Sequence, residues 1–213
     1  MKKNLVWSLF YYILSAFGIS LTIKAFIGVS SFNSLNVTLS TFSSIKVGTI
    51  TTMINLSFFV LCILLDKKRT LSSYLTMLVT VLLFGTVINL FVYGLLAPMT
   101  VSAYLPRVFL FSIGTLIGGY GTGRALGLGT LKFPIEQFCL LLAEKTKRTF
   151  SFYRYSIDIV CIALSLLLSV VYQLPIAVRE GTIISLFLLS FMISFAKDLP
   201  TPLVFRPKKR LEN

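Results

Sequence analysis

The residues best suited to chemistry are a few charged side chains inside apolar stretches. Arg154 and Asp158 are four residues apart in FYRYSID, so on a helix they share one face and can form an ion pair. Asp158 would lie about 10 Å inside a membrane-spanning helix, where an unpaired carboxylate is costly and pairing with Arg154 lowers the cost. Two interpretations stay open: a structural ion pair, or a site that binds substrate or couples protons.

A second carboxylate stands at the start of a shorter apolar run. In KFPIEQF, Pro134 comes two residues before Glu136. Proline favours the first turn of a helix, and a carboxylate there interacts well with the positive helix end and can cap free N–H groups. Capping alone explains Glu136, but Glu136 and Gln137 at a broken helix end could also face a ligand cavity. Asn33 and Asn36 in SSFNSLNV have the same two interpretations.

The common catalytic and metal sites are excluded by composition. The chain has no histidine, which removes Ser-His and Cys-His nucleophile pairs and HExxH zinc sites. Its three cysteines, Cys62, Cys139 and Cys161, are isolated in apolar segments without CxxC spacing, so they are expected to be small core residues. We therefore expect no enzymatic activity, no metal site and no cofactor.

Composition places the chain in a membrane. Of its 213 residues 56% are hydrophobic and 13% charged, and the mean hydropathy is +0.89, whereas soluble domains carry about 25% charged residues. Without the alternating pattern of a membrane barrel, we expect an all-α membrane protein. Six segments are apolar enough to span a hydrocarbon core as helices. They lie near residues 5–27, 48–65, 71–96, 108–124, 152–173 and 181–197.

The distribution of the positive charges, which give a net charge of +13, indicates the orientation of the chain in the membrane. If the N-terminus is inside and there are six spans, most of the 20 Lys and Arg residues are cytoplasmic, as the positive-inside rule requires. The four exceptions are Lys24, Lys46, Arg107 and Arg179. This predicts a multi-pass membrane protein with both termini cytoplasmic. Anionic lipid headgroups explain the basic clusters, so nucleic acid is not an expected partner.

The two halves of the sequence resemble each other. GTVINLF from Gly85 and GTIISLF from Gly181 share five of seven residues. Three crossings in each half would make the second half enter from the opposite side, so the prediction is two inverted three-helix repeats. The expected units are a first repeat, an extracytoplasmic loop, a second repeat and a basic cytoplasmic tail, at residues 1–97, 98–106, 107–200 and 201–213.

A second correspondence aligns residues 31–65 with 134–168 without a gap. It sets Asn33 against Glu136 and Asn55 against Asp158. The segments 29–46 and 129–148 are too polar or too short to span, which predicts re-entrant or interfacial half-helices, the first from outside and the second from inside. Any site made by both would be asymmetric, because Asn33 is neutral.

Other polar and small residues have simpler explanations. Asn55 and Asn89 are expected to form interhelical hydrogen bonds, with cavity lining as the second interpretation. The glycine-rich run 114–129 contains small-xxx-small spacings that favour close helix packing, and it matches a phosphate-binding loop only loosely. The expected packing glycines are Gly114, Gly118, Gly119, Gly123, Gly85 and Gly181.

The run GLGTLKFPIEQFCLLLAEKTKRTFSFYRYSID resembles the second-half signature of YczE/YitT-like bacterial membrane proteins. Pro134 and Glu136 match its Pro-x-Asp turn, and Arg154 with Asp158 matches the basic and acidic pair of its next span. The stretch from Leu142 to Thr146 matches its Leu-Ala-Glu-Arg-Thr-like segment. Ser-Phe-Asn at 31–33 departs from the Pro-Trp-Asp of the first half. The resemblance implies an architecture, in a short form without the soluble C-terminal domain, more than a function.

These features predict a secondary transporter or permease for a small polar or anionic solute, working by alternating access. Asn33, Asn36, Glu136 and Gln137 would line the site, while Arg154 with Asp158 would bind or gate. Without an ATP-binding motif, energy would come from an ion gradient or a partner subunit. The alternative is a non-transporting accessory protein, an assembly factor or the substrate-binding subunit of a larger transporter. The tail FRPKKRLEN could dock a partner, and homo-oligomerisation stays open.

Overall fold

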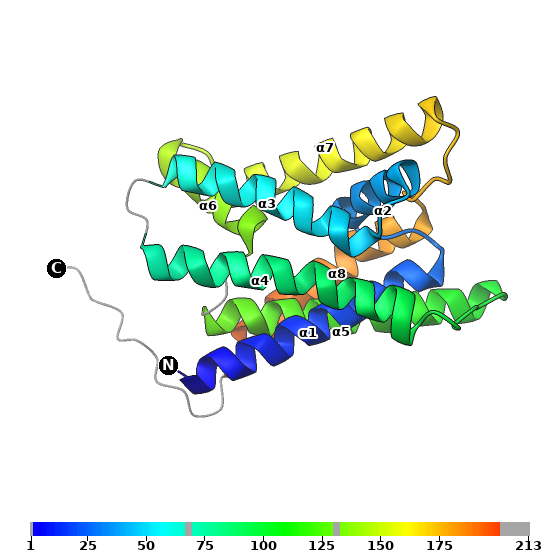
Figure 1. Cartoon of the computed structure of the whole chain (residues 1–213), viewed down its shortest axis with the longest axis horizontal. Helices are drawn as coiled ribbons and strands as arrows, with labels where there is room; N and C mark the ends of the chain where they lie inside the picture. Colours follow the sequence, from blue (N-terminus) through cyan, green and yellow to red (C-terminus); the bar gives the residue numbers. More distant parts are fainter. Residues whose placement is uncertain (1, 67–69, 130–132, 201–213) are drawn as a thin grey trace.

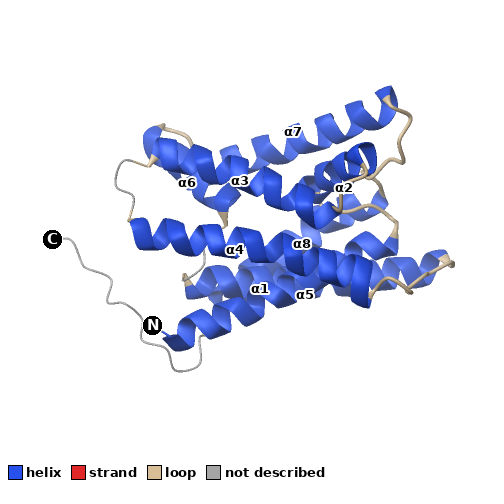
Figure 2. Cartoon of the chain, viewed as in Figure 1, coloured by secondary structure: helices blue, strands red, loops and turns tan. Residues whose placement is uncertain are grey.

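The computed structural model describes residues 2–66, 70–129 and 133–200, which form helices and short connections without a β-strand (Figure 1, Figure 2). The predicted all-α fold is confirmed for these residues. The helices are α1 (Lys2–Ala25), α2 (Ser31–Ser43), α3 (Val47–Leu65), α4 (Leu71–Leu90), α5 (Tyr104–Leu128), α6 (Pro134–Lys145), α7 (Phe150–Val171) and α8 (Glu180–Asp198). A π-helical segment, η1 (Phe91–Leu95), continues α4.

Local sequence explains several helix boundaries. Pro134 begins α6 at the position where its missing N–H is not needed. Thr149 precedes α7, and its hydroxyl oxygen accepts a hydrogen bond of 3.3 Å from the Phe152 N–H, which satisfies one of the free donors of the first turn. Gly129 ends α5 with φ of 62°, a conformation that glycine adopts without strain.

The described residues form six long helices and two short ones. The long helices run roughly along the longest dimension of the molecule (Figure 1), while α2 has 13 residues and α6 has 12. We call the end where α1 begins and α8 finishes the terminal end, and the opposite one the far end. α6 lies towards the terminal end and α2 towards the far end (Figure 1). They occupy the segments 29–46 and 129–148, for which half-helices were expected.

α5 contacts α1 on one side and α8 on the other, and these are the most extensive contacts between helices among the described residues. Glycines permit the approach of α1 and α5. A Cβ at Gly18 would collide with the backbone of Gly118 and Gly114, and a Cβ at Gly121 would lie 2.6 Å from the nitrogen of Ser15. Such contacts between backbones are typical of small-residue interfaces in membranes.

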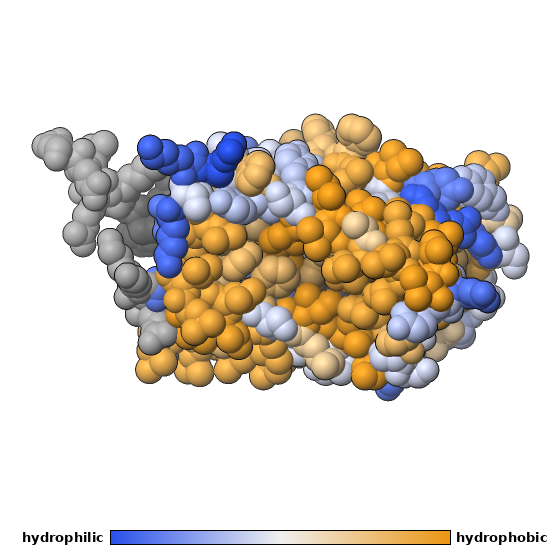
Figure 3. All heavy atoms as spheres, turned by 90° about the horizontal axis from the view of Figure 1, so that it is seen from above, coloured by the Kyte–Doolittle hydropathy of each residue, from blue (hydrophilic) through white to orange (hydrophobic). Residues whose placement is uncertain are grey.

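The chain is a multi-pass membrane protein by the length and apolarity of its helices. Five helical segments among the described residues meet both criteria: Leu5–Ala25, Val47–Leu65, Leu71–Leu95, Phe150–Val171 and Glu180–Asp198. Hydrophobic side chains cover much of the face in Figure 3, and hydrophilic ones gather towards its two ends. The sixth expected span, 108–124, lies in α5, which has 25 residues but is too rich in glycine to reach the same apolarity.

The first prediction concerns the α1–α5 contact. Gly18→Ala should lower the free energy of unfolding by about 1–3 kcal/mol, because the added methyl group collides with backbone atoms that have no alternative position. Gly118→Ala is the matched control across the same contact, since a Cβ there would meet its nearest atoms at 3.6 Å. Thermal unfolding of the detergent-purified variants measures both. Equal stability of the two variants would contradict this packing.

Candidate functional site

α2 begins inside the bundle. Ser30, the residue before α2, lines a small cavity together with Ile19 of α1, Gly118 of α5 and Leu189 of α8. These three positions lie well inside their helices, so the N-terminal end of α2 is at an intermediate depth. The Ser30 side chain accepts no capping hydrogen bond from the backbone of α2, which leaves the positive end of α2 directed into the interior.

α6 also begins inside the bundle. Phe133, the residue before α6, stacks on Tyr12 of α1 with ring centroids 5.0 Å apart and contacts Phe84 of α4 edge-on at 6.4 Å. The thiol of Cys62 in α3 donates a hydrogen bond of 3.4 Å to the carbonyl oxygen of Pro134. Contacts from three helices therefore hold the start of α6 in place.

Three charged side chains gather where α6 meets α7. The Arg154 Nη1 donates to Asp158 Oδ1 at 2.6 Å, and Arg154 Nε lies 3.9 Å from Glu136 Oε1. The side chains of Arg154, Glu136 and Asp158 are 28%, 25% and 13% exposed, so all three are mostly enclosed by protein. Within the described part of the chain Glu136 accepts no hydrogen bond, and it therefore faces Arg154 instead of capping an N–H group of α6.

The start of α2 carries a chain of amide contacts. Asn33 Nδ2 donates to Ser30 Oγ at 3.0 Å, and Asn36 Nδ2 donates to Asn33 Oδ1 at 3.4 Å. Asn36 is fully buried, and its Oδ1 has no hydrogen-bond partner. A buried acceptor without a donor costs about 1–3 kcal/mol, so Asn36 destabilises the free protein unless another group satisfies it.

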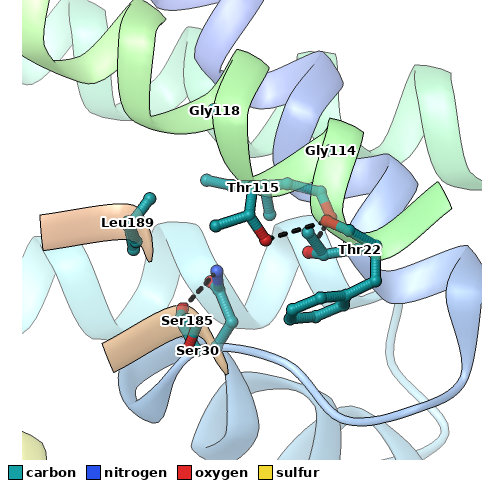
Figure 4. A pocket seen from close by; sticks show the side chains of 10 residues that line it. Thr22, Ser30, Gly114, Thr115, Gly118, Ser185 and Leu189 are labelled. Atoms are coloured by element: carbon teal, nitrogen blue, oxygen red, sulfur yellow. Dashed lines mark hydrogen bonds between the residues drawn. The ribbon is translucent and has the colours of Figure 1, made fainter. Parts of the chain in front are cut away.

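The cavity next to α2 has a volume of about 20 Å³, which is enough for one water-sized group. The hydroxyl groups of Thr22, Thr115 and Ser185 each donate to a carbonyl oxygen of their own helix, at 2.7, 2.8 and 2.8 Å. Their protons are therefore used, and their oxygens offer lone pairs to the cavity. Figure 4 shows Thr22 and Thr115 on one side of it, with Ser30 and Ser185 on the other.

The candidate residues form two groups in the structure. Asn33 and Asn36 lie at the start of α2, and Glu136 lies with the ion pair of α7. No hydrogen bond or ion pair joins these groups within residues 2–66, 70–129 and 133–200. Gln137 follows Glu136 in α6, and its partly buried side chain forms no hydrogen bond within those ranges. A single central site lined by both half-helices stays a prediction.

The two remaining asparagines differ in role. Asn89 connects α4 to the start of α3: its Oδ1 accepts from the Gly48 N–H at 2.8 Å, and its Nδ2 donates to Thr49 Oγ1 at 3.0 Å. Asn55 is buried and donates to the Thr51 carbonyl oxygen of its own helix at 2.8 Å. Neither is among the residues that line the cavity beside α2.

The candidate glycines lie at helix contacts. Gly114 and Gly118 face α1, and Gly119 and Gly123 face Met192 and Ile193 of α8. Gly85 contacts the Gly48 backbone of α3. The Gly181 N–H donates to the Ile27 carbonyl oxygen at 2.8 Å, and a Cβ at Gly181 would meet the Phe111 ring at 2.9 Å.

Sequence reasoning missed the role of Arg124. We expected only a cytoplasmic base, but its side chain is 4% exposed, and Nη1 donates to the carbonyl oxygens of Leu199 at 2.7 Å and Ala196 at 3.4 Å. The guanidinium also lies 5.5 Å from the centre of the Tyr11 ring. It therefore satisfies carbonyls at the end of α8. The small residues on both sides of Arg124 were the one signal that this position is enclosed.

Sequence comparison gives a family but no activity. Residues 2–198 match DUF6198, a family of unknown function. The chain belongs to the DUF6198 family. This DUF6198 chain is also 29% identical over 171 residues to the uncharacterized protein YyaS of Bacillus subtilis (strain 168). The aligned residues make up 80% of this chain and 81% of YyaS. No solved structure matches the DUF6198 chain.

The second prediction compares two asparagines. Asn36→Leu should leave the stability of the ligand-free protein unchanged or raise it, because a side chain of similar shape removes an unsatisfied acceptor and loses only the long hydrogen bond of 3.4 Å to Asn33. Asn89→Leu should lower the free energy of unfolding by about 1–3 kcal/mol, because it leaves the buried Gly48 N–H without its acceptor. Thermal unfolding in detergent measures both. A large loss of stability in Asn36→Leu would show that the amide has a structural role.

The third prediction concerns the shared guanidinium. Asp158→Asn alone should cost roughly 1–2 kcal/mol, since Glu136 remains beside Arg154. The double variant Glu136→Gln/Asp158→Asn should cost more than the sum of the single changes, because Arg154 then lacks any carboxylate. Thermal unfolding measures the difference. Combining Asp158→Asn with Glu144→Gln, a change at an exposed acid of α6, is the additive control. If the losses of stability add in both pairs of variants, Glu136 and Asp158 do not share the Arg154 guanidinium.

Proposed function

We propose that this chain is a secondary transporter that moves a small polar or anionic solute across the bacterial cytoplasmic membrane by alternating access. The observation that carries the proposal is the pair of short helices, α2 and α6, which begin inside the bundle and run out towards opposite ends. Inverted-repeat transporters build solute sites at such interrupted helices, with the positive helix ends facing the ligand.

Contacts between α1 and α5 support an inverted repeat. At the spacing that aligns 31 with 134, positions 11, 15 and 18 correspond to 114, 118 and 121. Gly18 faces the backbones of Gly114 and Gly118, and Gly121 faces those of Tyr11 and Ser15. Exchanging the two halves therefore maps this contact onto itself, which is the behaviour of residues around a pseudo-twofold axis.

The short helices support the same relation. α2 packs against α7, and α6 packs against α3, so each contacts a long helix of the other half. The contacts use matching positions of the long helices: Ser165 of α7 shares a 2.8 Å hydrogen bond with Thr38 of α2, and Cys62 of α3 bonds to Pro134 of α6. Residues 62 and 165 have the same spacing as 31 and 134. The proposed repeats are 1–97 and 107–200, joined by 98–106.

One difference between the proposed repeats favours alternating access. α3 packs against α4, whereas their counterparts α7 and α8 make no comparable contact, and α8 packs more extensively on α5 than α4 does on α1. Two repeats of related sequence in different arrangements are what a transporter needs, because exchanging their arrangements opens the opposite side.

Six spans with the N-terminus inside complete the proposed topology, with α5 as the sixth span. Described bases at the far end are Lys24, Lys46, Arg107 and Arg179, and those at the terminal end include Lys145, Lys147, Arg148 and Lys197. The terminal end would then be cytoplasmic, next to anionic headgroups. The basic tail 201–213 lies outside the described residues. The likeness to YczE/YitT-like proteins belongs to this proposal as an expectation about architecture.

Asn33, Asn36 and the hydroxyls around the small cavity are the proposed solute contacts. An amide acceptor and hydroxyl oxygens with free lone pairs can accept hydrogen bonds from a polar solute, and the positive end of α2 can hold an acceptor or an anionic group. Arg154 would bind or gate at the start of α6. The unsatisfied Asn36 Oδ1 supports a ligand contact, since Asn36 donates to Asn33, which lines the cavity.

The fourth prediction tests this function. Pools of metabolites are screened for solutes that raise the unfolding temperature of the purified protein, since a ligand of the folded state stabilises it. A solute identified in this way should show saturable flux in proteoliposomes, and Asn36→Leu should fold normally but lose both responses. A wild-type protein that moves none of these solutes, yet co-purifies stably with a partner, would favour an accessory protein instead.

A further inference from the structure

The group formed by Glu136, Arg154 and Asp158 has an uncompensated charge. When all three are ionised, two carboxylates face one guanidinium, a net charge of −1. All three side chains are mostly enclosed, and they belong to a membrane protein. Net charge in such an interior is costly, and a carboxylate there is usually neutralised by a proton or a bound cation.

The uncompensated charge belongs to Glu136. Arg154 forms a short, charge-assisted hydrogen bond of 2.6 Å with Asp158, whereas its Nε is 3.9 Å from Glu136, too far for a hydrogen bond. Arg154 therefore satisfies Asp158 and only attracts Glu136 electrostatically. The oxygens of Glu136 remain without a hydrogen-bond donor in the described part of the chain.

A second polar group without a partner lies near Glu136. Tyr12 of α1 is 3% exposed, its hydroxyl forms no hydrogen bond among the described residues, and its ring stacks on Phe133, three residues before Glu136. The Tyr12 ring is fixed by contacts with Phe133 at 5.0 Å and Phe84 at 4.5 Å. A phenol can donate to a carboxylate or turn its lone pair towards a cation. The contact of Tyr12 with Phe133 therefore joins α1 to the residue just before the helical turn that carries Glu136.

The other helices around α6 bring no cation that could replace a bound ion. α3 and α4 carry no charged side chain within their bounds, and the lysines of α1 stand at its two ends. α7 brings only Arg154 and Asp158 as charged side chains. The titratable groups around Glu136 are the phenol of Tyr12, the thiols of Cys62, Cys139 and Cys161, the guanidinium of Arg154 and the carboxylate of Asp158.

We propose that Glu136, with the Tyr12 hydroxyl beside it, binds a small monovalent cation, a proton or Na⁺, and that this cation is the coupling ion of the transporter. Its role as coupling ion rests on the proposed function, but the binding does not. With the cation bound, the group is neutral and Arg154 stays with Asp158. Without it, Glu136 attracts Arg154 more strongly and draws the start of α6 towards α7, which links ion binding to the position of a half-helix.

The fifth prediction tests binding on the full-length protein in detergent, with Glu136→Gln and the matched control Glu144→Gln at the exposed end of α6. Unfolding temperature is measured in NaCl against choline chloride at equal ionic strength, and as a function of pH. If Na⁺ is bound, saturating NaCl should raise the unfolding temperature of wild type and Glu144→Gln by about 5 °C, and should not raise that of Glu136→Gln.

If a proton is bound instead, NaCl and choline chloride act alike and the pH dependence decides. The folded state then binds more protons than the unfolded state, so the stability of wild type and Glu144→Gln should fall as pH rises from mildly acidic to mildly alkaline. Glu136→Gln should remove this slope. Equal Na⁺ and pH responses in wild type, Glu136→Gln and Glu144→Gln would overturn the proposal.

Two further measurements cover the case in which Glu136→Gln does not fold. Glu136→Asp keeps the charge on a shorter side chain and should weaken the cation response by about tenfold in concentration, or 1.4 kcal/mol. Binding of radioactive sodium and uptake of protons are measured directly on wild type, and a protein that binds neither overturns the proposal. A cation response without solute flux would contradict the proposed transport and leave the binding site in place.

Discussion

The close contact of α1 with α5 is the constraint on which the rest of the structure depends. Glycines at positions 18 and 121 allow two backbones to approach until a methyl group no longer fits. In lipid, helices associate through such close packing, because lipid chains are as apolar as the helix surfaces and burial of apolar surface therefore gives little driving force. With α5 fixed between α1 and α8, α2 begins beside residues of these three helices. α6 begins beside α1, where Phe133 stacks on Tyr12.

The polar groups in this interior separate into satisfied and unsatisfied ones, and that difference distinguishes structure from candidate function. Asn89 and Arg124 make hydrogen bonds between helices that hold α4 on α3 and α5 on α8. Asn36 has an acceptor without a donor, and Glu136 has a carboxylate without a hydrogen bond. Three further buried atoms among the described residues have no hydrogen-bond partner, Ser8 Oγ in α1, Arg124 Nε in α5 and Ser169 Oγ in α7, whereas Asn36 and Glu136 lie in the two short helices. A membrane interior makes such groups costly, which is the physical argument for assigning them to a ligand and an ion.

The amino-acid sequence predicted much of the fold because hydropathy and helix-start signals are local. The two short helices were placed from Pro134 and from the polarity and length of their segments, and α6 begins at Pro134 as expected. The apolarity of α5 was overestimated: five helices meet the criteria for a membrane span and α5 does not. Its glycines are less apolar than leucine or valine, so they lower the apolarity of α5. The same glycines let neighbouring helices approach closely, and a helix enclosed by neighbours needs small residues more than it needs large apolar residues that face lipid.

The sequence by itself determined that the chain is an all-α membrane protein, where its helices begin, and that Arg154 and Asp158 can pair, because these follow from composition and from spacing along one helix. Only the tertiary structure decided which partners the polar groups find. It left Asn33 and Asn36 apart from Glu136, gave Arg154 a short bond to Asp158 and a long contact to Glu136, and buried Arg124 against the end of α8. Those outcomes depend on distances between helices, which packing fixes and no local pattern encodes.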